Sequence, residues 1–437
     1  MSGFNVQVFS NEYLPPGGTE VHAVVTVRAD GSAASATGGN EAIEVLVLDS
    51  SGSMQTDGRI YEARRALAAA VSQIRDGVWF SIVAGTEAAH LVYPHAQVKG
   101  YHSGAVRADA STRGQALEAI KQVRADGGTA ISTWLDAAAG IVNGFPGAIH
   151  HVLLVTDGKN ESEPPAALHA ALARYQGLYQ VDCRGVGANW SVPELRSISQ
   201  AFLGTVDIIP QPQEMAEEFK AIMEAAMGKA IASVELRVWT PQHAELIFVK
   251  QVAPVIEDLT ARAQPGPNPL TRDFPTGAWG AEERDYHVAV RVKAAGVGEE
   301  MLAARISLVV NDTPISQGLV KAMWSQDEQL TARINPEVAH YTGQQELAAA
   351  IADGLAARQA GNDDEATTKL GRAVQLAAAA GNDATTKLLA QVVEIDNAES
   401  GTVRLKRNAE ALDLMALDTR STKTTRVRPA GGGEGGA

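Results

Sequence analysis

The chain is poor in cysteine, in basic charge and in long apolar runs, and each shortage excludes a class of protein. Its 437 residues contain one cysteine, Cys183, so no disulfide can form within the chain and nothing points to an oxidising compartment. The formal net charge of -14 argues against nucleic-acid binding, which usually requires a basic surface. No apolar run approaches the roughly 20 residues of a membrane helix. The first residues, MSGFNVQVFS, lack the basic start and apolar core of a signal peptide. We therefore expect a cytoplasmic protein without a membrane span.

Residues 41–228 alternate apolar strands with amphipathic helices. Strands are expected at Ile43–Leu48, Trp79–Ala84, His151–Thr156, Tyr179–Gly185 and Thr205–Ile209. Helices are expected at Ile60–Arg75, Thr112–Arg124, Ser132–Val142, Pro165–Tyr175, Val192–Ala201 and Glu214–Ala226. This alternation predicts an α/β domain with a Rossmann-like, doubly wound parallel sheet and helices on both faces.

Residues 1–40 and 229–330 contain strand patterns without long helices between them. Segments such as FNVQVFS, HAVVTVRA, AELIFVK and DYHVAVRVKA favour strands, several with period-two alternation. We expect these two regions to form one antiparallel β-sandwich, into which the α/β domain is inserted. Two unrelated β patches are the alternative.

The C-terminal region divides into a helical part and a tail. Residues 336–398 are rich in alanine and contain a weak repeat, GNDDEATTKLGRAVQLA and GNDATTKLLAQVVEI. In each copy, Gly-Asn-Asp can end one helix and cap the next. Two copies are too few for a solenoid, so we expect a small helical hairpin domain. Residues 399–437 are rich in Thr and Arg and then in Gly, which predicts a flexible tail with little to bury.

Small polar residues cluster at three turns of the predicted α/β domain. Asp49, Ser51 and Ser53 form D-x-S-x-S at the end of the first strand, Thr129 lies in DGGTAIS, and Asp157 ends VLLVTD. Ligands bind at the carboxyl edge of such sheets, and two carboxylates with three hydroxyls suit Mg²⁺ or Mn²⁺ better than Zn²⁺. Two aspartates about 5–6 Å apart would repel by roughly 3 kcal/mol at an effective dielectric near 20. A divalent cation would turn this repulsion into attraction.

These five residues, in this order, resemble the metal ion-dependent adhesion site (MIDAS) of von Willebrand factor type A (VWA) domains, and residues 41–228 resemble the whole domain. The resemblance implies that Ser51 and Ser53 bind the ion directly, and that Asp49 and Asp157 act mostly through water. It implies either mode for Thr129, depending on conformational state. The implied ion is Mg²⁺, with Mn²⁺ or Ca²⁺ as alternatives. A Glu or Asp of a partner protein would take the vacant coordination position.

The chain lacks the motifs of the enzymes that could use similar residues. There is no G-x-x-x-x-G-K-[ST] phosphate loop and no G-x-S-x-G motif, as a nucleotide-binding protein or a serine hydrolase would require. An aspartyl-phosphate enzyme would have a second acidic residue where serines follow Asp49. We therefore expect no enzymatic activity. The adjacent His150 and His151 begin a strand and point to opposite faces, which favours a structural role for both.

The C-terminal tail contains candidate phosphorylation sites. STKTTRV places Thr422, Thr424 and Thr425 among basic residues, where a kinase could phosphorylate them and an arginine-lined reader could bind the phosphate. The order of segments resembles bacterial multi-domain VWA proteins, which are often associated with Ser/Thr kinases and forkhead-associated (FHA) phosphothreonine readers. A solubilising basic tail is the alternative.

Three functions follow from these patterns. The first is a cytoplasmic, divalent-metal-dependent protein–protein interaction module that binds an acidic residue of a partner through its MIDAS. The second is a phosphothreonine-regulated signalling adaptor in a Ser/Thr kinase and FHA pathway. The third is an accessory subunit of an AAA+ or metal-chelatase machine, although the chain has no ATPase signature of its own. The sequence leaves open whether the helix at Glu214–Ala226 moves when a ligand binds.

Overall fold

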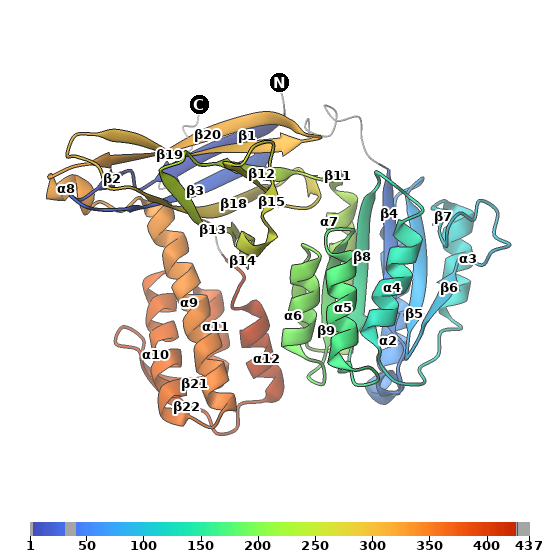
Figure 1. The fold of residues 1–437 in the computed structure, drawn as a ribbon. Coiled ribbons are helices and arrows are strands. Elements are labelled where there is room, and N and C mark those ends of the chain that lie inside the picture. The colour runs from blue at the N-terminus through green and yellow to red at the C-terminus, as the bar shows by residue number, and fades with distance from the viewer. Residues whose placement is uncertain (1–2, 31–40, 425, 427–437) are drawn as a thin grey trace, which may run out of the picture. The chain divides into compact units, whose positions relative to one another are not determined.

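The computed structural model describes residues 3–30, 41–424 and 426. The chain divides into two compact units (Figure 1), which we describe separately. The first unit comprises Ala29–Val234 and Thr276–Ala281; the second comprises Ser2–Arg28, Glu235–Pro275 and Glu282–Ala437. Among the described helices, none combines the length with the apolar character needed to cross a membrane.

The first unit is built on a mixed, mostly parallel sheet. Its strand order is β10 (Val206–Ile209), β9 (Gln180–Val186), β8 (Ile149–Thr156), β4 (Ala42–Asp49), β5 (Trp79–Gly85) and β6 (Ala89–Tyr93). The first five strands run parallel, as the apolar runs predicted. The sequence did not predict β6 and β7 (Val106–Arg107), which pair antiparallel with β5. Much of β6 is exposed, so it lacks the continuous apolar run that identified the inner strands.

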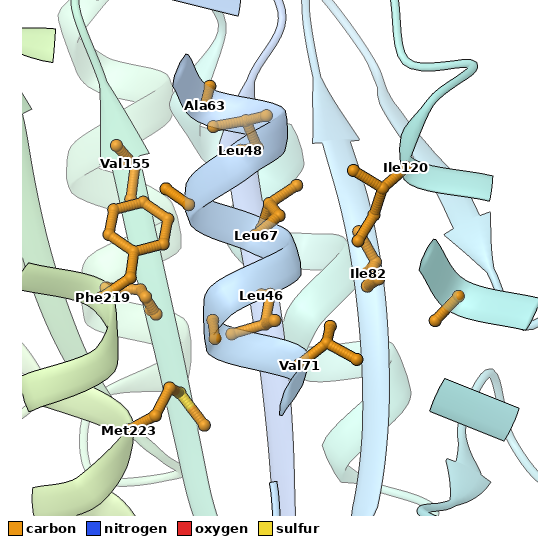
Figure 2. Packing of buried hydrophobic residues seen from close by; sticks show 14 of the residues in the cluster. Leu46, Leu48, Ala63, Leu67, Val71, Ile82, Ile120, Val155, Phe219 and Met223 are labelled. Carbon is orange, nitrogen blue, oxygen red and sulfur yellow. The ribbon is translucent and has the colours of Figure 1, made fainter. Parts of the chain in front are cut away.

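Helices cover both faces of this sheet (Figure 1). The cluster on one face includes residues of α2 (Arg59–Gln73), α3 (Ala110–Ile120) and α7 (Met215–Met227). Leu46 and Leu48 of β4 point toward α2, where Leu67 packs, and Phe219 of α7 lies beside them (Figure 2). The helices α4 (Ile131–Val142), α5 (Pro165–Tyr175) and α6 (Val192–Ala201) lie outside this cluster and pack on the other face. The predicted doubly wound α/β fold is thereby confirmed.

A short segment from beyond the α/β domain returns to this unit. The strand β11 (Lys229–Ile231) pairs antiparallel with β17 (Trp279–Gly280). Trp279 is fully buried, and its indole N–H donates to Thr276 Oγ1 at 2.9 Å. The sequence had assigned all of 229–330 to the β-sandwich, and this assignment is wrong for these strands. A two-residue strand carries no periodicity that could have revealed the pairing.

The second unit contains the two sheets of the predicted β-sandwich, in which the pairing is largely antiparallel and β2 (Tyr13–Leu14) is a parallel exception beside β20 (Thr313–Trp324). The first has the order β1 (Phe4–Ser10), β3 (Glu20–Ala29), β18 (Glu283–Val292), β13 (Ala244–Ala253) and β14 (Glu257–Asp258). The second has the order β15 (Gln264–Pro265), β16 (Thr271–Pro275), β12 (Glu235–Trp239), β19 (Glu300–Val310), β20 (Thr313–Trp324) and β2 (Tyr13–Leu14). Gly318 of β20 lies so close to β1 that a Cβ there would be 2.3 Å from Val8 Cγ2. The two sheets therefore pack as a sandwich built from segments that precede and follow the α/β domain in the chain.

The helical region extends beyond the predicted hairpin. It contains α8 (Glu328–Thr331), α9 (Pro336–Gln359), α10 (Asp363–Ala379), α11 (Asp383–Val392), β21 (Val393–Asn397), β22 (Thr402–Leu405) and α12 (Ala411–Arg420). Both Gly-Asn-Asp turns act as expected. Gly361 and Gly381 have φ of 77° and 61°, and Asn362 and Asn382 accept hydrogen bonds from backbone N–H groups in the next helix.

The prediction of a flexible tail from residue 399 is wrong as far as residue 424. The strands β21 and β22 form a hairpin, and Leu417 of α12 is fully buried in the core of the helical region. After α12, Lys423 forms a β-bridge with Val255. The sequence prediction missed α12 because residues 399–437 as a whole are rich in Thr, Arg and Gly, and the apolar stripe of α12 is short.

Candidate metal site

The five predicted ligands lie on three loops at the carboxyl edge of the central sheet. Asp49 is the last residue of β4. Ser51 is the N-cap of a 3-10 helix, η1 (Gly52–Gly58), and Ser53 lies in its first turn. Thr129 lies two residues before α4, and Asp157 directly follows β8. Because β4 and β8 are parallel neighbours, the chain delivers both aspartates to the same edge.

The side-chain oxygens of these residues converge on one point. Ser51 Oγ lies 2.9 Å from Ser53 Oγ, which in turn donates to Asp157 Oδ1 at 2.6 Å. A Cβ built on Gly158 would lie 3.4 Å from Ser53 Oγ, 3.5 Å from Thr129 Oγ1 and 3.9 Å from Asp49 Oδ2. The structure therefore brings all five predicted residues together.

Backbone hydrogen bonds hold the first two loops against each other. The Gly52 N–H donates to the Gly127 carbonyl at 2.8 Å, and the Asp126 N–H donates to the Ser50 carbonyl at 2.8 Å. Gly127 has φ of 78°, a conformation that few residues other than glycine adopt. The DGGT turn therefore needs its glycine to approach the D-x-S-x-S turn so closely.

Two further side chains position the threonine loop. Ser162 Oγ accepts from the Thr129 N–H at 2.9 Å, and the Ser162 N–H donates to the Thr129 carbonyl at 2.9 Å. Glu87 accepts from the Gly128 N–H at 2.6 Å. Neither contact could be predicted from the sequence, because each joins residues more than thirty positions apart.

Burial dominates the electrostatics of Asp49, which is inaccessible to solvent. Loss of hydration raises the pKa of Asp49 to about 6, although hydrogen bonds from Ser51 and Thr156 oppose this rise, and the charge of Asp157 adds to it. The Ser51 N–H donates to Asp49 Oδ1 at 2.8 Å, and Thr156 Oγ1 donates to Oδ2. A nearby cation would favour the charged form of this carboxylate.

An arginine that the sequence did not single out contacts the second aspartate. Arg59 begins α2, and its Nη1 lies 2.5 Å from Asp157 Oδ2. Its Nη2 lies 3.3 Å from Asp57 Oδ2. The Arg59 side chain is 11% exposed and that of Asp157 is fully buried, so the ion pair is shielded from water.

The site opens into a cleft of about 440 Å³. Its lining includes Ser51, Ser53, Thr129, Asp157, Lys159 and Glu161. Within the described residues, no group of three or more His, Cys, Asp or Glu side chains could hold a metal ion. A metal site in this part of the chain would therefore have to use hydroxyl groups and water beside the carboxylates. The donor set at the cleft meets this requirement for a hard cation.

Two of the predicted phosphorylation residues, Thr422 and Thr424, lie in the other unit. Thr424 Oγ1 donates to the Val252 carbonyl at 2.5 Å, and its N–H donates to the Pro254 carbonyl at 3.0 Å. The Thr422 carbonyl accepts from the Ile256 N–H at 2.8 Å, whereas Thr425 lies outside the described residues. Phosphorylation stays a prediction, and a kinase would have to displace this segment to reach Thr424.

Comparisons with known proteins agree with the fold. A von Willebrand factor type A domain profile matches residues 44–208, and a von Willebrand factor type A C-terminal domain profile matches residues 375–421. The solved structure "von Willebrand factor type A from Catenulispora acidiphila" is similar at 44% identity, with 98% of each chain covered and a TM-score of 0.91. The ArnB paralog VWA2 from Sulfolobus acidocaldarius shares the fold at 13% identity, with 96% of this chain and 98% of that chain covered and a TM-score of 0.53. No curated protein matches the sequence.

Proposed function

Because this chain belongs to the von Willebrand factor type A family, we propose that it is a divalent-metal-dependent interaction module that binds a carboxylate of a partner protein. One observation carries the proposal. Two carboxylates and three hydroxyls from three loops surround a common point beside Gly158. This donor set is the one that Mg²⁺ prefers, and Mn²⁺ or Ca²⁺ are alternatives. We further propose a cytoplasmic location and a role in binding, without a catalytic step.

The charged carboxylates and the neutral hydroxyl groups would have different roles at the ion. Asp49, Ser51, Ser53, Thr129 and Asp157 would hold the ion, which when bound would present an open coordination position to an incoming carboxylate. The Ser51 N–H bond to Asp49 fixes the first loop before any ligand arrives. The hydroxyl groups supply donor oxygens without negative charge, so part of the ion's charge stays available to the partner.

Titration with Mn²⁺, followed by electron paramagnetic resonance, tests the metal site. Wild-type protein should bind about one Mn²⁺ per chain, and excess Mg²⁺ should displace it. The Asp49→Asn variant should lose this binding, because it removes a charge at the centre of the site. Asp136→Asn is the matched control, because Asp136 lies on α4 with a side chain that is 47% exposed. Equal Mn²⁺ binding by Asp49→Asn and wild type would refute the proposed site.

Partner binding needs a separate test. Immobilised protein should retain its partner from a lysate in Mg²⁺ and release it in EDTA, and Asp49→Asn should retain little of it in either buffer. A partner that stays bound in EDTA and also binds Asp49→Asn would show that this site does not capture it. The kinase–FHA adaptor and the AAA+ or metal-chelatase subunit stay predictions, since no contact among the described residues favours either.

A further inference from the structure

The backbone before α2 aims Arg59 at the metal site. Asp57 and Gly58 have φ of 52° and 69°, so the last two residues of η1 adopt the left-handed conformation directly before α2. Apart from glycine, Asn and Asp are the residues that adopt this conformation most readily. The turn directs the Arg59 guanidinium at the loop after β8, where it meets Asp157. The same guanidinium lies near the loop after β9, with Nη2 3.8 Å from a Cβ built on Gly187.

We propose that Arg59 is a resident counter-cation of the candidate metal site, and that it weakens metal binding while it strengthens binding of the partner carboxylate. This inference rests on the function proposed above. The contact is specific, because Nη1 approaches one oxygen of Asp157 while Ser53 donates to the other. Both carboxylate oxygens of Asp157 are therefore occupied before a metal ion arrives.

The formal charges of the buried groups show why such an arginine matters. Asp49, Asp157 and Arg59 sum to one negative charge, so a divalent ion leaves the site with one positive charge. A partner carboxylate then neutralises it. Without Arg59, the loaded site would be neutral and the bound carboxylate would leave a net negative charge. Buried charges interact strongly, so Arg59 favours capture of a carboxylate over retention of the metal.

Other charged side chains around the cleft are exposed to water, so they affect metal and carboxylate binding less than Arg59 does. Asp57 has a side chain that is 73% exposed, so water screens its charge. Lys159 and Glu161 are both exposed at the mouth of the cleft, and their formal charges cancel. Arg59 is thus a cation in direct contact with Asp157, a buried acid of the site.

The test compares Mn²⁺ dissociation constants for wild type, Arg59→Gln and Arg59→Lys. Arg59→Gln should bind Mn²⁺ roughly tenfold more tightly or better, because it removes one unit of positive charge beside Asp157. Arg59→Lys keeps the charge and should stay near wild type. Arg65→Gln is the control, because it removes the same charge from an exposed position on α2.

The second arm uses acetate as the carboxylate probe. Bound Mn²⁺ accelerates relaxation of the acetate methyl protons, and this effect should weaken in Mn²⁺-loaded Arg59→Gln relative to wild type. Equal Mn²⁺ affinity and equal acetate relaxation in the two proteins would overturn the role of Arg59 but leave the metal site standing. Failure of every variant and of wild type to bind Mn²⁺ would overturn both proposals.

A measurement on the wild-type protein covers the case in which Arg59→Gln does not fold. The guanidinium signals of Arg59 can be followed by nitrogen-15 NMR during a Mg²⁺ titration. They should shift with the same dissociation constant as Mg²⁺ binding, because the ion and Arg59 share Asp157. Arg59 signals that do not respond to bound Mg²⁺ would contradict the proposal.

Discussion

A histidine buried between two carboxylates predicts that the α/β unit loses stability at alkaline pH. His151 on β8 has Nδ1 2.6 Å from Glu44 Oε2 on β4 and Nε2 3.0 Å from Asp182 Oδ2 on β9. The three strands are neighbours in the sheet. An imidazolium donates from both ring nitrogens, so the charged form satisfies both contacts. Burial alone lowers the pKa of His151, but Glu44 and Asp182 outweigh it and raise the pKa to about 10.

The sign and size of the effect follow from this pKa. The unfolded chain releases the proton near pH 6.5, whereas the folded chain holds it to about pH 10. Since the folded pKa is the higher one, the stabilisation is complete below pH 6.5 and is lost as the pH rises to 10. Each pH unit within this window removes up to about 1.4 kcal/mol. The free energy of unfolding should therefore fall by roughly 2–3 kcal/mol between pH 7 and 9.

The assay is urea unfolding at pH 7 and pH 9 for wild type, His151→Gln and His169→Gln. His169 is exposed on α5, so its variant should keep the wild-type slope. His151→Gln should lose about 3–5 kcal/mol at pH 7, because a buried ion pair is broken, and much less at pH 9. Parallel pH profiles for wild type and His151→Gln would refute the reasoning. So would a neutral His151 imidazole at pH 8 in the nitrogen-15 NMR spectrum.

Three further predictions concern packing, the C-terminal segment and acid stability. Gly85→Ala should lower the free energy of unfolding by about 1–3 kcal/mol, because its Cβ would lie 2.2 Å from the Trp134 ring. In the control variant Gly140→Ala, the new Cβ meets nothing within 4 Å, so thermal unfolding should show no loss of stability. Thr424→Val should speed proteolysis of the C-terminal segment, because it removes a hydroxyl that donates to a β13 carbonyl, at a cost of about 1 kcal/mol; an unchanged cleavage rate would contradict this. Burial, helped by His22 and Lys250, lowers the pKa of His287 to about 3. The free energy of unfolding should therefore fall as the pH drops from 6.5 toward 3. In His287→Gln, urea unfolding should show a smaller loss of stability over this pH range.

The parts of the fold that the sequence predicted are those encoded by local pattern. The strands β4 and β8 are buried on both faces of the sheet, so each reads as an unbroken apolar run. The Gly-Asn-Asp caps were predicted for the same reason, because the glycine and the cap are adjacent in sequence. The D-x-S-x-S turn was recognised because its spacing and its place at a strand end are both local features.

The parts that the sequence missed depend on pairings between distant residues. Arg59 and Asp157 are 98 positions apart, and nothing near Arg59 indicates a partner. The contact of His151 with Glu44 spans 107 positions and depends on which strands become neighbours. The segment Thr276–Ala281 returns to the α/β unit only because of tertiary packing. Composition and periodicity contain no such information.

Asp182 and Asp49, on neighbouring parts of the central sheet, differ in whether a cation contacts the carboxylate. Asp182 contacts His151, and this contact outweighs burial and holds the pKa of Asp182 well below its usual range. Asp49 receives hydrogen bonds from neutral groups, and its pKa rises to about 6. Both residues lie on the same sheet and loss of hydration favours the neutral form of each, so the difference follows from the neighbouring charge. Arg59 contacts Asp157, which leaves the charge of Asp49 for a cation from solution to neutralise. Beside Asp182 and Glu44, the cation is His151, a residue of the sheet itself. Asp49 receives hydrogen bonds from neutral groups instead, and this is where we propose that a metal ion binds.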